Sequence, residues 1–352
     1  MSEMRDAGRW AAISLLAALA VAGLSYWLSL APSPKPATAP PDQFSAERAM
    51  AHVEVMAHKP HPSGSLENDK VRDYIVAQLH ELGIEVEVVE EVMRRGGNSV
   101  AVCHAVLGRI RGTDSTKAFA VDAHYDSVPY GPGASDIISG VAAMIEAARA
   151  ILAGPPLKND IIFCFADQEE ISAGGAKAFV EHPWFQEVGV LLGLEARGTK
   201  GPALMFETSQ MNGYLIRELK KAGVKPRANS IMFDVYDRLP FGSDFGVYKH
   251  HVAGYNVAFI DNFAYYHISL DSPENLSMAS LQHHGEYTLG LARHFGNKPI
   301  GETYAPNVTY FNTLGGHMVI YPQSWALPLA IAAILLFAGG LIYGFLRRRL
   351  RI

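Results

Sequence analysis

Four strand-like runs of mostly apolar residues end in a histidine or in acidic residues, and they constrain the fold more than any other feature. They are AVDAHYD at residues 120–126, DIIFCFADQEE at 160–170, VGVLLGLEARG at 188–198 and YNVAFIDNFAYYH at 255–267. Continuous apolar strands are typical of parallel sheets that helices cover on both faces. Open α/β sheets bind ligands at the carboxyl ends of their strands. The sequence therefore predicts an α/β domain whose site gathers histidines and acids at one edge of the sheet.

Helical and strand-like segments alternate around these four runs, which favours a layered α/β domain over residues 44–298. Helical periodicity is expected at residues 44–56, 68–82, 136–153, 176–181 and 213–222, and further strands at 84–92 and 98–108. We expect three layers, α/β/α, around a central mixed, mostly parallel sheet. The sequence contains no internal repeat.

Both ends of the chain carry uncharged apolar runs that are long enough to span a membrane. Residues 10–31 and 325–346 each reach the roughly 20 residues that a bilayer core requires. The arginines at 347, 348, 349 and 351 predict a basic cytoplasmic tail at residues 347–352. We expect the first run to be an uncleaved signal anchor behind a cytoplasmic segment at residues 1–9. A cleaved signal peptide is the alternative interpretation.

Two spans place both termini in the cytoplasm and the domain between them outside it. This predicts an inner- or plasma-membrane protein whose domain faces the periplasm or another extracytoplasmic compartment, or the lumen of the endoplasmic reticulum in a eukaryote. The Pro/Ala-rich segment at residues 32–43 predicts an extended linker that holds the domain away from the membrane. Residues 299–324 are expected to form a juxtamembrane segment.

Charge and cysteine content exclude several classes of protein. The net charge of −5 gives no sign of the basic patch of a nucleic-acid-binding protein. The two cysteines, Cys103 and Cys164, lie in apolar strand-like runs and are expected to be buried free thiols rather than zinc ligands or a disulfide framework. The histidine pairs at 250–251 and 283–284 are expected to lie on the surface.

Five side chains at or near the strand ends form a set of metal ligands: His124, Asp136, Glu170, Glu195 and His267. Imidazole and carboxylate donors without cysteine suit a catalytic divalent ion such as Zn²⁺. Because one catalytic zinc usually takes three protein ligands, five favour two ions that share a carboxylate.

The acids that remain beside these ligands also have expected roles. A loop rich in glycine can bring Asp136 close to both ions, and Asp126 is placed to accept the other ring proton of His124. In the pair Glu169–Glu170, one carboxylate is expected to bind metal and the other to act as general base. Each feature alone has an ordinary structural explanation, such as an acidic helix start; their combination favours a metal site.

The motifs resemble those of metallopeptidase family twenty-eight, the di-zinc exopeptidases, especially the branch of the endoplasmic-reticulum metallopeptidases. The similar segments are HYDSVPYGPGASDIISG, FADQEEISAGGAKAF, LEARGTKGPALMFETS, YYHISLDSPENL and HPSGSLENDKVRDYIVAQL, within residues 44–295. The resemblance implies a zinc-exopeptidase-like fold and two zinc ions. One ion would be held by His124, Asp136 and Glu195 and the other by Asp136, Glu170 and His267, with Glu169 as base. Ile137 and Ile138 depart from the polar residue that relatives often carry there.

Two further residues have an expected role in substrate binding and an ordinary alternative. Tyr266 precedes a ligand and could donate a hydrogen bond to the carbonyl oxygen under attack, as in some members of the family, or it could be a structural tyrosine. Arg197 could bind a substrate carboxylate or pair with a neighbouring acid.

The leading hypothesis is a membrane-anchored zinc aminopeptidase that hydrolyses the N-terminal bond of peptides or proteins. A glutaminyl cyclase with a single zinc uses the same ligand types and is the second hypothesis. A peptidase-like ectodomain that binds without catalysis is the third. A two-domain carboxypeptidase is disfavoured, since the stretch between Glu195 and His267 is too short for an inserted domain.

Overall fold

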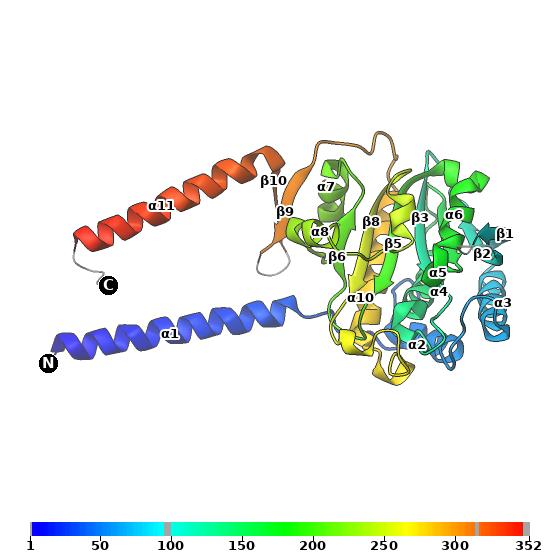
Figure 1. Cartoon of the computed structure of the whole chain (residues 1–352), viewed down its shortest axis with the longest axis horizontal. Coiled ribbons are helices and arrows are strands. Elements are labelled where there is room, and N and C mark those ends of the chain that lie inside the picture. The colour runs from blue at the N-terminus through cyan, green and yellow to red at the C-terminus, as the bar shows by residue number, and fades with distance from the viewer. Residues whose placement is uncertain (1, 95–99, 314–316, 348–352) are drawn as a thin grey trace.

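A twisted sheet of eight strands forms the centre of the domain (Figure 1). The structure is a computed structural model that describes residues 2–94, 100–313 and 317–347. The strands are β1 (Glu85–Arg94), β2 (Val100–Ile110), β3 (Ala118–His124), β4 (Ile161–Ala166), β5 (Val188–Ala196), β6 (Leu204–Thr208), β7 (Arg227–Ala228) and β8 (Ala253–Phe259). Their order in the sheet is β1-β2-β4-β3-β5-β8-β6-β7.

The four central strands, β4, β3, β5 and β8, run parallel to one another. They coincide with the four apolar runs of the sequence, and β3, β4 and β8 are buried along their whole length. Antiparallel pairs join β1 to β2, β2 to β4 and β6 to β8 at the two sides of this centre. The predicted mixed, mostly parallel sheet is confirmed.

Helices cover both faces of the sheet and complete the three layers. One face packs against α2 (Ala46–Met56), α3 (Leu66–Glu81), α4 (Ser139–Leu152), α7 (Gly213–Lys221) and α10 (Met278–Gly296). The other face packs against α6 (Gly174–Glu181) and α9 (Phe245–Tyr248), where Phe179, Phe185 and Tyr248 form an aromatic cluster. Local chemistry sets the helix ends: the Ser65 side chain accepts a hydrogen bond from the Asn68 amide at the start of α3.

The histidine pair at 283–284 is buried in α10, so the prediction of surface histidines is wrong for this pair. The ring of His284 packs on Phe259 with ring centres 4.7 Å apart. His283 Nδ1 accepts a hydrogen bond from the Ala203 amide, and its Nε2 donates one to the Lys225 carbonyl oxygen. The reason is that α10 is covered by α2, α4 and the sheet at once, so most of its circumference is buried. His250 and His251 are exposed as expected, and Cys103 and Cys164 are buried free thiols.

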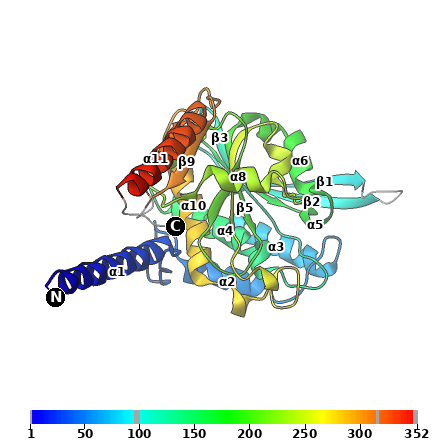
Figure 2. The same cartoon turned by 60° about the vertical axis from the view of Figure 1, so that its left-hand side comes forward.

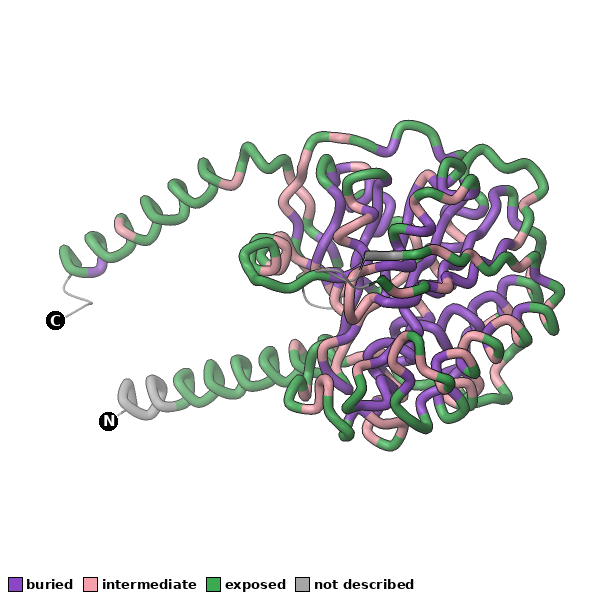
Figure 3. Tube along the Cα trace, turned by 45° about the vertical axis from the view of Figure 1, so that its right-hand side comes forward, coloured by how far each residue is buried: buried purple, intermediate pink, exposed green. Residues whose placement is uncertain are grey.

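Two long helices extend away from the domain at the ends of the chain, α1 (Ser2–Ser29) and α11 (Ala326–Leu346). They are exposed along most of their length (Figure 3). The segments Arg9–Ser29 and Gln323–Leu346 are long and apolar enough to cross a membrane. The hairpin of β9 (Val308–Asn312) and β10 (Met318–Pro322) leads into α11. Residues 1 and 348–352, which include most of the expected basic tail, lie outside the described residues.

The segment at residues 32–43 differs from the expected extended spacer because it is bound to the surface of the domain. The Arg48 guanidinium donates to the carbonyl oxygens of Ala37, Ala39 and Gln43 at 2.6, 3.0 and 2.6 Å. Arg149 donates to the carbonyl oxygen of Pro41 at 2.7 Å. These tertiary contacts, which the Pro/Ala composition does not reveal, make the segment part of the folded domain.

Candidate metal centre and active site

The carboxyl ends of the four parallel strands bring the expected metal ligands to one edge of the sheet. His124 ends β3, and its Nδ1 lies 2.9 Å from the backbone oxygen of Asp126 and 3.5 Å from its carboxylate. The hydrogen bond to that backbone oxygen fixes the ring orientation, so Nε2 points to the site. From there, Nε2 lies 3.8 Å from Asp136 Oδ1 and 3.8 Å from Glu169 Oε2.

A tight loop after β3 carries Asp136 into the site. Gly133 has a φ of +65°, and a Cβ at this position would lie 2.7 Å from the backbone oxygen of Asp136, so the loop requires glycine there. The carboxylate of Asp271 accepts hydrogen bonds from the amides of Ser135 at 2.8 Å and Asp136 at 3.2 Å. Asp271 thus holds the backbone of the loop at Ser135 and Asp136, and Asp136 is almost fully buried.

The pair Glu169–Glu170 begins the short helix α5 (Glu169–Ser172) directly after β4. The carboxylate of Asp126 accepts from the Glu169 amide at 3.0 Å and from the Glu170 amide at 3.4 Å. Asp126 therefore connects the end of β3 to the end of β4. The sequence predicted its place beside His124 but not this second set of contacts.

Beyond β8, His267 completes the group with an imidazole that faces two acids. Its Nε2 lies 3.1 Å from Asp136 Oδ2 and 3.1 Å from Glu170 Oε2. The ring of Tyr266 stacks on that of His267 with centres 3.6 Å apart. The two oxygens of Asp136 thus face different histidines, His124 on one side and His267 on the other.

These side chains form two groups whose potential ligand atoms lie within 4.8 Å of one another: His124, Asp136 and Glu195, and Asp136, Glu170 and His267. Glu170 Oε1 is buried and has no hydrogen-bond partner among the described residues, which fits an oxygen that binds a cation. Nitrogen and carboxylate oxygen donors in threes suit zinc. The residues present therefore fit zinc, and Asp136 belongs to both groups.

The electrostatics of this edge also favour cations. Four acids meet here, Asp136, Glu169, Glu170 and Glu195, and among the described residues no lysine or arginine forms an ion pair with them. Burial raises the pKa of Glu169 to about 8, and the charges of Asp136 and Glu170 act in the same direction. Burial likewise raises the pKa of Glu195 well above its usual range. Crowded, buried carboxylates are stabilised by nearby positive charge.

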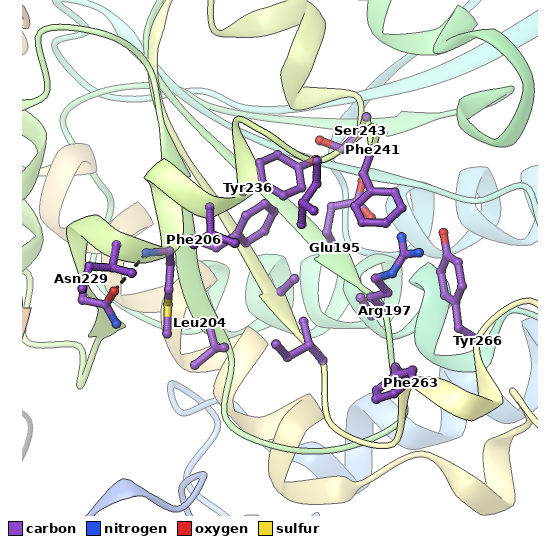
Figure 4. Close-up of a pocket in the computed structure, with 18 residues that line it drawn as sticks. Glu195, Arg197, Leu204, Phe206, Asn229, Tyr236, Phe241, Ser243, Phe263 and Tyr266 are labelled. Atoms are coloured by element: carbon purple, nitrogen blue, oxygen red, sulfur yellow. Dashed lines mark hydrogen bonds between the residues drawn. The ribbon is translucent and has the colours of Figure 1, made fainter.

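A largely apolar cavity of about 610 Å³ opens beside Glu195 (Figure 4). Its walls include the aromatic rings of Phe206, Tyr236 and Phe241. The Arg197 guanidinium lies 3.7 Å from the centre of the Phe241 ring and 4.7 Å from that of Tyr266. Within the described part of the chain Arg197 makes no ion pair, so the expected alternative of pairing with a neighbouring acid is not realised.

Sequence reasoning missed two acids and the outer wall of the cavity. Asp271 holds the loop of Asp136. Asp244 is buried, neither of its carboxylate oxygens has a partner in the part of the chain that the structure describes, and burial raises its pKa well above the usual range. The only signal for Asp271 is its position four residues after His267. The helix α8 (Ser230–Tyr236), which overhangs the cavity, carries no pattern that points to the site.

Comparisons with known proteins agree with this arrangement. The model of peptidase family M28 matches residues 105–292. A putative endoplasmic reticulum metallopeptidase 1-B of Caenorhabditis elegans is 28% identical over 359 residues, which cover 93% of this chain and 40% of the relative. A vacuolar membrane protease of Candida albicans is 32% identical over 278 residues, 76% of this chain and 32% of the relative. The chain thus spans less than half the length of these relatives.

Solved structures share the fold at lower identity. A zinc aminopeptidase from Bacillus subtilis matches with a TM-score of 0.58 and 15% identity, over 74% of this chain and 97% of that one. A glutaminyl cyclase from Porphyromonas gingivalis matches with a TM-score of 0.57 and 19% identity, over 71% and 97%. The family match covers more than half of the chain and includes every ligand position described above. The chain therefore belongs to peptidase family M28.

Proposed function

We propose that the chain is a membrane-anchored aminopeptidase that uses two zinc ions to hydrolyse the N-terminal bond of peptides or proteins. The observation that supports this most directly is the carboxylate of Asp136, whose two oxygens face His124 and His267. One ion would be held by His124, Asp136 and Glu195. The other would be held by Asp136, Glu170 and His267. When bound, zinc acidifies water and polarises carbonyl groups.

Glu169 is the general base of the proposed reaction. It lies 3.8 Å from His124 and belongs to neither of the two groups of ligands, so its carboxylate is free to take a proton from the attacking water. The same carboxylate then delivers the proton to the leaving amine. Asp126 positions the base, because its carboxylate accepts hydrogen bonds from the backbone amides of Glu169 and Glu170.

Tyr266 and Arg197 are the proposed substrate-binding residues. The Tyr266 ring contacts both the His267 ring and the Arg197 guanidinium, at the edge of the cavity. From there its hydroxyl donates to the carbonyl oxygen on which negative charge develops. Arg197 is free of ion pairs among the described residues and binds a carboxylate or carbonyl group of the substrate.

The test combines a metal count with an assay on the purified full-length chain. We expect two zinc ions per chain by elemental analysis, hydrolysis of leucine p-nitroanilide, loss of activity with a chelator and its return with zinc. One ion per chain with cyclisation of N-terminal glutamine contradicts the proposal and favours a cyclase. Bound metal without turnover of any substrate favours a binding ectodomain.

A further inference from the structure

The helix α8 (Ser230–Tyr236) and the turn after it carry a row of exposed apolar side chains, Ile231, Val235 and Leu239, at the rim of the cavity beside Glu195. Ile231 is 71% exposed and Val235 is 52% exposed, and Leu239 continues the row at 43%. Because residues four apart lie on one side of a helix, Ile231 and Val235 share one side of α8, and Leu239 lies in the turn that follows. Exposed apolar surface of this kind marks contact with a membrane, a partner or a ligand.

The strand before α8 is bonded to the domain end of the first apolar helix. The Arg227 guanidinium in β7 donates to the carbonyl oxygens of Leu28, Ser29 and Leu30. A cavity of about 680 Å³ lies between this end of α1 and α8. Ile231 and Met232 line both this cavity and the one beside Glu195, so α8 forms a shared wall between the end of the span and the site.

The other apolar helix is reached from α8 through the β9–β10 hairpin. The Tyr310 amide donates to Ser230 Oγ at 2.9 Å, and Asn229 forms a β-bridge with Phe311. The same hairpin continues directly into the apolar segment Gln323–Leu346. Figure 1 shows α8 on the side of the domain from which α1 and α11 both extend.

Exposed aromatic residues indicate where the surface of the membrane lies relative to α8. Tyr26 and Trp27 on α1 and Trp325 before α11 are more than half exposed at the domain ends of the two spans. Tryptophan and tyrosine gather at membrane–water interfaces. Since Arg227 contacts residues only one to three positions after Trp27, α8 lies at the same level. A short helix with an apolar side suits that interface, and the charged residue of α8 is Asp234.

We propose that Ile231, Val235 and Leu239 rest on the surface of the bilayer between the two spans, so that the cavity beside Glu195 opens at the membrane interface. Resting on the proposed peptidase function, this assigns the substrate class. The substrates are polypeptides held at the membrane whose first residue is large and apolar, because the cavity is walled by Phe206, Tyr236 and Phe241.

Fluorescence quenching tests the contact without any need for turnover. A single cysteine is introduced as Ile231→Cys or, as matched control, Val92→Cys, in the full-length chain, whose own two cysteines are buried. Val92 is also exposed, at 66%, and lies on β1 at the far side of the domain (Figure 1). Each protein is labelled with an environment-sensitive dye and placed in lipid nanodiscs.

The measured quantity at each position is the ratio of quenching by a nitroxide on the lipid to quenching by dissolved iodide. We expect this ratio to be about three times larger at position 231 than at position 92. Equal ratios overturn the proposal. A label at position 231 that is shielded from both quenchers also overturns it, since a second copy or a partner protein then covers the row.

A second experiment tests the substrate class. In nanodiscs, the wild-type chain should favour a lipid-anchored peptide with an N-terminal leucine over the same peptide without the lipid by about tenfold in kcat/KM. Ile231→Asp should reduce this ratio and Val92→Asp should not. An unchanged ratio in Ile231→Asp overturns the assigned substrate class. Absence of hydrolysis with either peptide refutes the proposed function instead, while the quenching result still decides the membrane contact.

Discussion

Glu169 is the proposed general base, and its substitution distinguishes an effect on catalysis from an effect on metal binding. It lies beside His124 but outside both groups of ligands. We therefore expect Glu169→Gln to keep its metal, since the amide replaces only the carboxylate that moves the proton. Hydrolysis should fall by about 10²- to 10⁴-fold, the usual contribution of a general base. Elemental analysis and p-nitroanilide assays on the same sample measure both effects.

The control for this substitution is Glu90→Gln, an exposed carboxylate on β1 that pairs with His104 and belongs to neither group of ligands. It should change neither metal content nor rate. A Glu169→Gln variant with full activity removes Glu169 from the role of base, and one that has lost its zinc shows that the residue is a ligand instead.

The buried pair His283 and His284 predicts a dependence of stability on pH. Burial lowers the pKa of His283 to about 4 and that of His284 to about 3. In the unfolded chain both titrate near 6.5, so below that pH the unfolded state binds protons that the folded state excludes. The free energy of unfolding should therefore be greatest above pH 6.5 and fall as the pH drops toward 4.

Replacing one of the two histidines isolates this effect. His284→Leu removes a ring whose two nitrogens are buried without partners, so we expect no loss of stability at pH 7.5. Between pH 7.5 and 5.5 the variant should lose about 1.4 kcal/mol less than the wild type, one pKa unit of titration. Urea unfolding at the two pH values measures this, with exposed His250→Ala as control. Identical pH dependence in His284→Leu and wild type contradicts the prediction.

The grouping of the proposed metal ligands could be predicted from the sequence, whereas the residues that position them could not. His124, Glu170 and Glu195 stand at the ends of apolar runs, and the rule for parallel sheets places such ends together. Asp271 accepts hydrogen bonds from the backbone amides of Ser135 and Asp136, which precede it by 136 and 135 residues. No local sequence pattern encodes contacts over such a separation. The burial of His284 depends on the elements that pack around α10. The local sequence around the histidine pair does not show which elements these are.

At the scale of elements, the four parallel strands were the most predictable part of the fold. A strand buried on both faces has to be apolar throughout, and this leaves a direct trace in the sequence. The helix α8 left no comparable trace, because its apolar residues face outward rather than into the core. Its place in the molecule depends on contacts with β6, β9 and the end of α1.

The segment at residues 32–43 gives a prediction about the attachment of the domain. Arg48 joins three carbonyl oxygens of this segment to Glu146, whose side chain is buried. Arg48→Ala should lower the free energy of unfolding by about 2–3 kcal/mol, since it leaves these acceptors without their donor. Limited proteolysis should also cut the segment faster.

The matched control is Arg111→Ala, which removes an exposed ion pair with Glu85. Exposed pairs contribute little, so neither stability nor the rate of cleavage at residues 32–43 should change measurably. Equal effects of the two substitutions, measured by urea unfolding and by mass spectrometry of the digest, contradict a specific role for Arg48.

At the scale of the whole molecule, the arrangement predicts which side of the membrane each part occupies. Arginines that follow a span favour the cytoplasm, so both termini should lie there and the peptidase domain on the opposite side. Protease added outside intact cells or spheroplasts should digest the domain and spare a C-terminal epitope tag. Digestion of the tag without prior lysis contradicts this orientation.

The two terminal helices leave the domain on the same side, and this has a kinetic consequence. A domain fastened by one flexible stalk can swing in any direction, whereas two attachment points leave it little rotation about an axis in the membrane plane. An enzyme fixed in this way meets other membrane-bound molecules by lateral diffusion in two dimensions. Its site stays at a constant distance from the membrane surface. A domain released from the membrane would keep its catalytic residues. It would meet membrane-bound molecules from bulk solution, where the effective concentration of one for the other is far lower.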